Sequence, residues 1–549
     1  MRLLDISAAL GALSVFSLGA NASPIESELV ERQSSFFALT GATGGVYPRL
    51  EVRDLANNPD QWNLFVLAMQ RFQLKPQTNK LSYYQVAGIH GRPYVNWDGV
   101  GPYASQPWWP GYCPHSSNLF GSWHRPYLSL WEQAIIQYAN EIINETPAGA
   151  TKTRYQTAVK TLRFPFWDWA KKTSSGITPQ PLTQAYIQVT FPQNGSSKSI
   201  PNPLYAYRFQ VVPDPYFDGS YSKNRQTTRS SRAEANLQAS YTSRRNTLLT
   251  LFSRNQAYNV FSTDANGNTA PNLEGIHNGV HSDIGGYMAQ ISYSAMDPIF
   301  AMHHANVDRV VAIWQTLYPN SWVGAASQTA GTRTMAPSSN QNANSPLTPF
   351  HRDTKGTFWT SNSVRATSAL GYTYPDLVGV SNSQLTTNLN RLYGNSATNS
   401  ALRGGSSDGD APATTYDYMA QVTLDKSVLG GVSYAVQFML DGDYFASFAA
   451  LAVPPSPGAQ AKAVTSSGTV MLTDALAQRG IDTSDRNATE QYLSENLTWQ
   501  VVQNDQVVNN VPNLNVTIAS AEVQPAKAVN QFATWLEPPQ EIDNSTSSS

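Results

Sequence analysis

Apolar residues recur at three- and four-residue spacing in three stretches before residue 395. The stretches are FVLAMQRFQ (65–73), SLWEQAIIQYANEII (129–143) and ANVDRVVAIWQTLY (305–318). This spacing places apolar side chains along one face of a helix. Long segments rich in Gly, Pro, Asn and Ser lie between the stretches, so residues 33–395 are predicted to form a mainly helical domain with long loops.

A different pattern begins after residue 415. YMAQVTLDKSVL, YAVQFML, LTWQVVQ and LNVTIAS are short, rich in β-branched residues and roughly alternating, with turn residues between them. Alternation of this kind is typical of strands with one buried face. We predict a small all-β sandwich over residues 416–540, followed by a disordered tail, EIDNSTSSS (541–549).

The segment between the two patterns is small, polar and rich in glycine. It reads LYGNSATNSALRGGSSDGDAPATT (392–415) and has the composition of a flexible, protease-accessible linker. We therefore predict a cleavable linker over residues 396–415, with Arg403 as its natural cutting point.

The first 22 residues read as a secretory signal peptide. Arg2 precedes an apolar run, and ANA (20–22) has the small-x-small form of a cleavage site. A buried N-terminal helix is the alternative. ER (31–32) offers a second trimming point, so residues 23–32 are a candidate propeptide. We expect a secreted protein, and no later segment is long and apolar enough to predict a membrane span.

Charge and cysteine content narrow the class further. The net charge is −2, so nothing indicates nucleic acid or another polyanion as a partner. Secreted proteins usually use disulfides, but Cys113 is the single cysteine and cannot form one within the chain. It is therefore a free thiol, a covalent partner of another group or a metal ligand. Asn-x-Ser/Thr triplets that fit passage through the secretory pathway begin at Asn144, Asn194, Asn487, Asn496, Asn515 and Asn544.

Six of the eight histidines fall into two groups of three. His277 and His281 in GIHNGVHSDIGG are four apart, so on a helix they face the same way and can share a metal. DPIFAMHHANVDR supplies His304 on the next predicted helix. The first half of the chain offers a parallel trio: His90 in GIHGRPY, His115 in CPHSS and His124 in FGSWHRPYL.

The helices that carry His124 and His304 correspond in register. A phenylalanine lies four residues before each of them, at Phe120 and Phe300. This correspondence selects His304 as the third ligand of its trio. His303 would lie about 100° round the helix and is expected to pack beside the site.

Two further residues extend this picture. Asp308 lies four residues after His304, so its carboxylate could orient that ring or brace the helix against Arg309. His351 lies in a polar loop and is expected to be structural.

A site of six histidines without a carboxylate favours particular metals. Imidazole suits copper, zinc, iron and nickel. Paired hydrolytic zinc or manganese centres usually include Asp or Glu, so a two-zinc hydrolase is disfavoured. Six neutral nitrogens can hold Cu(I) and still bind Cu(II), which suits a metal pair that takes up oxygen.

The motifs GIHG, C-x-HSS, WHRPYL, H-N-x-x-H and DPIF-x-x-HH-x-N-x-D together resemble the type 3 copper proteins, and most closely the fungal tyrosinases. The resemblance covers roughly residues 40–395. It implies a four-helix bundle that holds two copper ions. One copper would be bound by His90, His115 and His124, and the other by His277, His281 and His304.

The resemblance also implies roles for residues around the copper pair. Fungal members join a cysteine to the second histidine by a thioether, which here would link Cys113 to His115; a buried free cysteine is the alternative. Glu274 and Asn278 match the pair that holds a water molecule proposed to take the proton of an incoming phenol, although Glu274 alone could be an ordinary acid. Ile291 falls at the position of a gate residue over the copper.

The ends of the copper domain and the β domain resemble the family as well. Tyr372 and Tyr374 match a Tyr-x-Tyr signature that pairs with an early arginine, here Arg49 or Arg53. The C-terminal domain resembles the family's shielding domain, which inserts a side chain over the copper pair until a protease removes it. The candidate plugs are Phe445 and Phe448 in DGDYFASF.

The resemblance therefore implies a secreted, latent tyrosinase. Such an enzyme hydroxylates monophenols at the ortho position and oxidises o-diphenols to o-quinones with dioxygen, after activation by a protease. A catechol oxidase or o-aminophenol oxidase with little activity on monophenols is the nearest alternative. An oxygen carrier of haemocyanin type would use the same histidines, but a single copper domain with a signal peptide and a detachable tail speaks against it.

Overall fold

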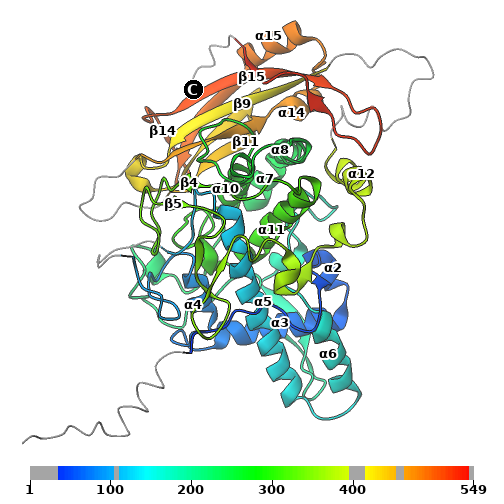
Figure 1. Ribbon diagram of the computed structural model, residues 1–549, viewed down its shortest axis with the longest axis vertical. Helices are drawn as coiled ribbons and strands as arrows, with labels where there is room; N and C mark the ends of the chain where they lie inside the picture. The colour runs from blue at the N-terminus through cyan, green and yellow to red at the C-terminus, as the bar shows by residue number, and fades with distance from the viewer. Residues whose placement is uncertain (1–34, 104–110, 395–414, 453–462, 543–549) are drawn as a thin grey trace, which may run out of the picture.

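The computed structural model describes residues 35–103, 111–394, 415–452 and 463–542. The predicted signal peptide and propeptide, the predicted linker up to residue 414 and the predicted tail after residue 542 lie outside these ranges. Figure 1 shows a helical body with a β domain seated on one end of it. Among the described helices, none combines the length and the apolarity that crossing a membrane requires.

Four helices form the centre of the helical body. α5 (Phe120–Glu145) packs against α3 (Pro59–Leu74) and α11 (Ile299–Leu317), and α11 packs against α10 (Leu273–Ile284). The predicted mainly helical core is therefore confirmed. The other helices described in this body are α2 (Val52–Ala56), α4 (Tyr83–Gly88), α6 (Ala150–Thr161), α7 (Ala233–Ala239), α8 (Tyr241–Ser253), α9 (Tyr258–Ser262) and α12 (Asn382–Tyr393).

Short two-stranded sheets fasten the long loops around this centre. They pair β1 (Tyr47–Pro48) with β8 (Tyr372–Thr373), β2 (Tyr186–Thr190) with β3 (Ser197–Pro201), β4 (Ala326–Ser327) with β5 (Asn340–Gln341), and β6 (Pro346–His351) with β7 (Phe358–Thr360). The β1–β8 pair is parallel and joins the start of the described chain to the region of the Tyr-x-Tyr signature.

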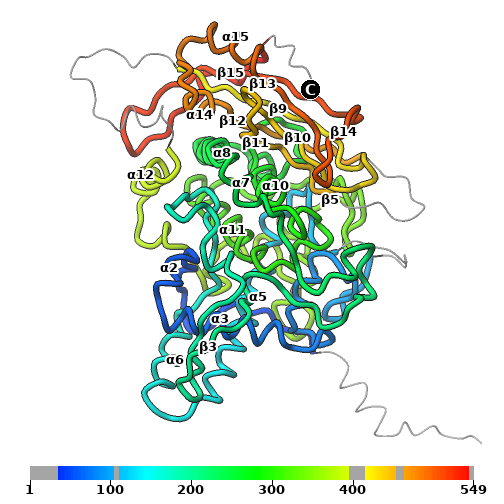
Figure 2. Tube along the Cα trace, turned by 180° about the vertical axis from the view of Figure 1, so that it is seen from behind, coloured from blue at the N-terminus to red at the C-terminus, as the bar shows by residue number. Residues whose placement is uncertain are grey.

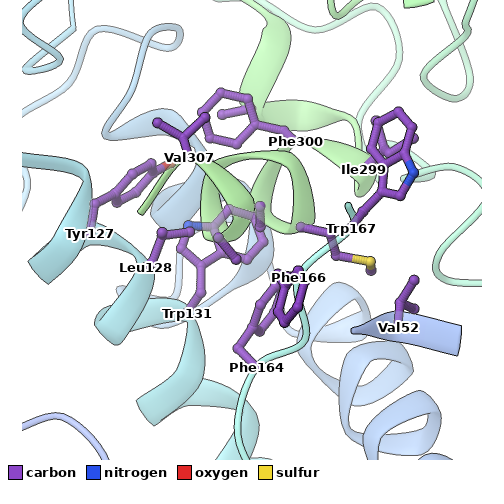
Figure 3. Packing of buried hydrophobic residues seen from close by; sticks show 14 of the residues in the cluster. Val52, Tyr127, Leu128, Trp131, Phe164, Phe166, Trp167, Ile299, Phe300 and Val307 are labelled. Atoms are coloured by element: carbon purple, nitrogen blue, oxygen red, sulfur yellow. The ribbon is translucent and has the colours of Figure 1, made fainter. Parts of the chain in front are cut away.

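Aromatic side chains fill the space beside α5 and α11, as Figure 3 shows. Trp131 of α5 is fully buried and makes edge contacts with Phe72 and Tyr83, at 5.6 and 5.1 Å between ring centroids. Phe164 and Trp167 line the same cluster. Large aromatic rings in T-shaped contact stabilise a core beyond the area they bury, so the helices that carry the histidines rest on a closely packed base.

The sequence fixes both ends of α10. The side chain of Asn272 accepts a hydrogen bond from the backbone N–H of Gly275 at 2.8 Å, which caps the first turn. Gly285 follows the last turn with φ of 67°, a conformation that glycine adopts without strain. The start and end of α10, and with them the positions of His277 and His281 along the helix, are therefore well defined.

The β domain consists of two antiparallel sheets. One sheet has the order β11-β10-β13-β14, and the other has the order β12-β9-β15-β16, with β17 also paired to β15. Val422 of β9 and Phe438 of β10 belong to one buried cluster between the sheets, so the predicted sandwich is confirmed. The strands are β9 (Thr415–Asp425), β10 (Tyr434–Leu440), β11 (Asp443–Ala450), β12 (Thr465–Met471), β13 (Leu497–Gln503), β14 (Gln506–Val508), β15 (Asn515–Gln524), β16 (Thr534–Trp535) and β17 (Gln540–Glu541).

The sandwich also contains two helices that the strand pattern did not predict. They are α14 (Thr473–Gln478) and α15 (Arg486–Asn496). α15 buries only Thr489 and Leu493, so its sequence lacks the apolar spacing by which a helix is recognised.

The β domain docks on the helical body through β11 and β12, which lie against α8 and α10 (Figure 2). The backbone N–H of Ser467 donates to the carbonyl of Asp264 at 2.7 Å, and the Asn272 side chain donates to the carbonyl of Ser467 at 2.9 Å. The hydroxyl of Ser243 donates to the carbonyl of Met471 at 2.7 Å. The β domain therefore covers the helix that carries His277 and His281.

Candidate metal centre

The first histidine trio converges from three segments. His90 follows α4, His115 lies in the loop before α5, and His124 is on α5. The ring centroids of His90 and His115 are 5.2 Å apart, and each lies 6.0 Å from that of His124. All three side chains are buried.

The second trio comes from two neighbouring helices. His277 and His281 lie one turn apart on α10, and His304 lies on α11. The ring centroid of His277 is 4.4 Å from that of His281 and 4.7 Å from that of His304. All three residues are fully buried.

The two trios face each other where α5 packs against α11. The rings of His124 and His304 are stacked with centroids 4.1 Å apart, and the rings of His115 and His277 are 5.7 Å apart. Ring nitrogens of His90, His124 and His304 lie within 4.8 Å of one another. The six histidines therefore form one centre that offers three ligands to each of two neighbouring metal ions.

In four of the six rings, a hydrogen bond sets which nitrogen faces this centre. The Nδ1 atoms of four rings lie within hydrogen-bond distance of oxygen atoms: His90 with the Ile291 carbonyl (3.2 Å), His124 with the Phe120 carbonyl (2.8 Å), His281 with the Met288 carbonyl (2.6 Å) and His277 with Asn278 Oδ1 (2.9 Å). A ring that donates its Nδ1 proton keeps a lone pair on Nε2 for a metal. The buried Nε2 atoms of His90 and His115 have no hydrogen-bond partner among the described residues. These orphaned nitrogens fit a bound metal ion.

Burial keeps the six imidazoles neutral. It is the first cause that lowers the pKa of each ring below 6.5, to about 3 for His124 and about 4 for His281. The pKa values of the other four rings, His90, His115, His277 and His304, are also lowered well below 6.5. Neutral imidazole is the form that binds a metal, and a centre without carboxylate ligands suits copper.

His303 and His304 differ in what they face. The Nε2 atom of His304 lies 3.1 Å from that of His277 and 3.4 Å from that of His281, and the ring also stacks on the first trio. His303 stacks on His277 at 4.9 Å and meets the His281 ring edge-on at 4.8 Å, and neither of its ring nitrogens has a hydrogen-bond partner among the described residues. Its nitrogens nevertheless lie within 4.8 Å of those of the second trio. The geometry therefore supports His304 as the ligand that reaches both halves of the centre.

Cys113 lies beside two rings of the first trio. Its Sγ atom is 3.3 Å from Nδ1 of His115 and 3.3 Å from Nε2 of His124. Burial raises the pKa of the thiol well above 9.0, so the sulfur is held as a neutral thiol when it is free. The predicted link to His115 stays a prediction, and the short approach to that ring supports it.

Glu274 and Asn278 lie one turn apart on α10, next to His277. The Glu274 carboxylate accepts hydrogen bonds from the backbone N–H of Ser116 at 2.7 Å and from the hydroxyl of Thr263 at 2.8 Å. The Asn278 side chain donates to Asp264 Oδ2 at 3.0 Å. The predicted pair of residues is therefore held beside the centre.

Two residues of this cluster were missed by the sequence reasoning. Asp264 joins Glu274 to Asn278, and Lys426 of the β domain forms ion pairs with Asp264 at 2.6 Å and with Glu274 at 3.9 Å. Neither residue stands in a recognisable motif, and only their approach in space makes them visible.

Ile291 lies at the mouth of the centre. It lines a small pocket together with His90, Cys113, His115 and Tyr94. Its side chain is buried, and its carbonyl accepts the hydrogen bond from His90. This placement is compatible with a gate role, which stays a prediction.

Asp308 acts differently from what its spacing suggested. It accepts hydrogen bonds from Arg125 at 2.7 Å, Tyr372 at 2.5 Å and Tyr374 at 2.7 Å. Nδ1 of His304 has no hydrogen-bond partner among the described residues, and Arg309 pairs with Asp376. The prediction that Asp308 orients His304 or braces Arg309 is therefore wrong, because buried tyrosines and a closer arginine take up the carboxylate.

The early arginine of the Tyr-x-Tyr signature is Arg49. Its guanidinium lies over the Tyr372 ring at 3.5 Å, and it pairs with Glu132 at 3.0 Å. Arg53 instead pairs with Glu51. His351 has its Nδ1 atom 2.9 Å from Asp98, in agreement with a structural role.

The candidate plugs do not reach the histidines. Phe445 is buried within the cluster of the β sandwich. Phe448 lies in the interface, where its ring is 3.1 Å from the position that a Cβ atom on Gly275 would occupy. In the described part of the chain, neither ring is in aromatic contact with a histidine of the centre, so neither is supported as the side chain that covers it.

A helical bundle with two facing histidine trios, followed by a β sandwich, defines a dinuclear metal protein of the type 3 copper class. Two family models match the chain. The common central domain of tyrosinase matches residues 80–317, which include all six histidines, and the tyrosinase C-terminal domain matches residues 417–518.

Relatives extend the match along most of the chain. Polyphenol oxidase 4 of Agaricus bisporus is 30% identical over 524 residues, which cover 86% of this chain and 84% of that protein. The tyrosinase of Podospora anserina is 37% identical over 61% of this chain, and that of Neurospora crassa is 38% identical over 62%. These two matches span 63% and 54% of the relatives, less than two thirds of their length. The chain belongs to the tyrosinase family.

Solved structures agree with this assignment. Recombinant mushroom tyrosinase superimposes with a TM-score of 0.83 and 28% identity, covering 93% of this chain and all of that chain. The holo-protyrosinase of Aspergillus oryzae superimposes with a TM-score of 0.73 and 22% identity, covering 93% of this chain and 98% of that chain, and so shares the fold.

Proposed function

We propose that this chain is a secreted, latent tyrosinase. Two copper ions would be held by His90, His115 and His124 on one side and by His277, His281 and His304 on the other. The observation that carries the proposal is the convergence of six buried, neutral imidazoles, two of them with orphaned Nε2 atoms. When bound, the copper pair supplies the redox chemistry with dioxygen.

The protein's own residues would position the phenol and handle its proton. Burial, followed by the nearby Asp264 carboxylate, raises the pKa of Glu274 to about 8. In its deprotonated form, a carboxylate with a raised pKa is a stronger base than an ordinary one. Together with Asn278, whose side chain Asp264 holds, Glu274 would hold a water molecule beside His277 that takes the proton of the phenol.

The overall reaction balances for both substrates. A monophenol and one dioxygen molecule give an o-quinone and one water, so one oxygen atom enters the ring and the other leaves as water. Two o-diphenols and one dioxygen molecule give two o-quinones and two waters. Each diphenol loses two electrons and two protons to oxygen.

We further propose that the chain is organised as a catalytic domain over residues 33–395 and a shielding domain over residues 416–540, joined by a protease-sensitive linker. The docking of the β domain on α10 supports this division. Mushroom tyrosinase has been crystallised in coexistent latent and active forms. Recovery of the chain from culture medium with a new N-terminus at residue 23 or 33 would support secretion, and its retention inside cells would contradict it.

The deciding experiment is oxygen uptake by the copper-loaded protein after cleavage in the linker. L-Tyrosine is compared with the matching o-diphenol. Uptake on both, with a lag on the monophenol, supports the proposal. Uptake on the diphenol alone moves the assignment to a catechol oxidase, and reversible oxygen binding without turnover moves it to an oxygen carrier.

A further inference from the structure

A lysine of the β domain reaches the residues beside the metal centre. Lys426 directly follows β9 and is 4% exposed. Its Nζ atom lies 2.6 Å from Asp264 Oδ2, donates to Ser116 Oγ at 2.7 Å and lies 3.9 Å from Glu274 Oε1. The ammonium group is therefore surrounded by two buried carboxylates and a hydroxyl of the helical body.

Asp264 connects the members of this cluster. Its carboxylate accepts hydrogen bonds from Asn278 at 3.0 Å and from Ser116 at 3.0 Å. Its backbone N–H donates to Glu274 Oε2 at 3.3 Å. Asp264 thus contacts Glu274 and Asn278 at the same time, and its hydrogen bond with Ser116 ties it to the segment that carries His115.

The β domain supplies the cation that pairs with this acidic cluster. Asp264 and Glu274 are both less than 2% exposed, and each is an acid. Within the described ranges, the ion pairs that join the helical body to the β domain all involve Lys426. A buried charge that loses its partner is strongly unfavourable, so this lysine matters more for docking than a surface cation would.

We propose that Asp264 is a positioning residue for Glu274 and Asn278, and that Lys426 is its removable counter-cation. Loss of the β domain would then change the charge around the proton-handling residues as well as uncover the centre. The inference rests on the proposed function of the site. It means that the charge of the Lys426 side chain helps to keep the full-length protein latent.

The first test replaces Lys426 in the full-length, copper-loaded protein. Lys426→Met removes the ammonium but keeps an unbranched side chain, Lys426→Arg keeps the charge, and Lys527→Met is a control at an exposed lysine of the same domain. We expect K426M to raise diphenol oxidation by the uncleaved protein about tenfold, because unpaired buried carboxylates disfavour docking. K426R and K527M should stay latent. A K426M protein as latent as the K527M control overturns the proposal.

Cleavage in the linker provides an internal control. Cleavage leaves residue 426 on the β-domain fragment, so once that fragment has been removed, wild type and K426M give the same catalytic fragment and must have the same activity and copper content. After cleavage, the β domain of K426M should separate from the catalytic domain on size-exclusion chromatography under conditions that retain the wild-type domain. Equal retention of both β domains contradicts the docking role.

The second test addresses Asp264 in the trimmed protein. Asp264→Asn should lower kcat on a monophenol about tenfold relative to kcat on the diphenol, a part of the roughly 10²–10⁴-fold that general acid–base catalysis contributes, at unchanged copper content. Ser116→Ala, which removes one hydrogen bond to Asp264, should shift the same ratio less. An unchanged ratio in both variants overturns the positioning role. If the trimmed wild type takes up no oxygen with either phenol, the proposed function itself fails.

Discussion

His303 and His304 are neighbours in the chain with different surroundings. His304 reaches both trios, whereas His303 contacts the second trio and Trp169. We expect His304→Gln to lose about one of two bound coppers, because three imidazoles hold each ion. His303→Gln should keep both. Copper per chain, measured by atomic absorption after dialysis, tests this pair of matched variants, and equal losses in both would contradict the assignment.

Cys113 gives a prediction that mass measurement can decide. Its sulfur lies 3.3 Å from the His115 ring, so a thioether could form with the loss of one hydrogen from each partner. We expect the peptide that contains both residues to be lighter than its sequence mass by two hydrogens after copper loading in air. Cys113→Ser should show the unmodified mass, and a Cys113 that alkylates freely after unfolding rules out the bond.

The buried imidazoles also predict a dependence of stability on pH. Burial depresses the pKa of His281 from 6.5 to about 4 in the folded chain. The metal-free protein therefore loses stability as the pH falls from 6.5 through about 4, because the His281 ring binds its proton in the unfolded chain before it does so in the folded chain. Melting temperatures at about pH 7 and about pH 4.5 should therefore differ less in metal-free His281→Gln than in wild type. An equal drop in both proteins would exclude this contribution.

At the scale of elements, Asp308 holds α11 to α5. Arg125 of α5 and Arg49 pair with its carboxylate, and all three side chains are fully buried. Asp308→Asn should destabilise the protein by about 3–5 kcal/mol, the usual cost of removing one partner from a buried ion pair. Urea denaturation of the metal-free protein measures this change.

The matched control is Asp60→Asn, which breaks the pair with the exposed Arg154. That change should have a much smaller effect, because water screens the charges. Comparable losses of unfolding free energy in D308N and D60N would contradict the proposal that Asp308 holds α11 to α5.

Elements with a clear apolar period were predictable, and elements without one were not. α3, α5 and α11 carry apolar residues at three- and four-residue spacing, so the sequence indicated them, although α11 is buried on all sides from Ile299 to Trp314. α15 buries two residues and was missed. The strands of the sandwich were recognisable because β-branched residues alternate along them.

At the scale of the whole molecule, the position of the β domain over α10 predicts latency. Arg403 is the only basic residue of the predicted linker 396–415. Brief trypsin treatment should raise diphenol oxidation about tenfold or more if the uncovered state is a minor population of the intact protein. Arg403→Ala should slow this activation. Full activity of the intact chain before cleavage would contradict the shielding role.

The sequence by itself determined the chemistry of this protein. Ligand spacing on α10 is local, because residues four apart share a helix face, so His277 and His281 could be paired without a structure. The absence of carboxylates from the predicted ligand set indicated copper, and the motifs indicated the family. These signals come from residues that lie close together in the chain, so they can be recognised without a structure.

Only the tertiary structure decided which distant groups meet. The chain brings His90 and His115 from loops to α5, gives Asp308 to Arg125 and two tyrosines, and sets Lys426 against Asp264. Such contacts depend on how helices and sheets pack, and packing joins residues whose separation in sequence carries no periodic signal. The physical reason is that a buried charge must find a partner wherever the fold places one.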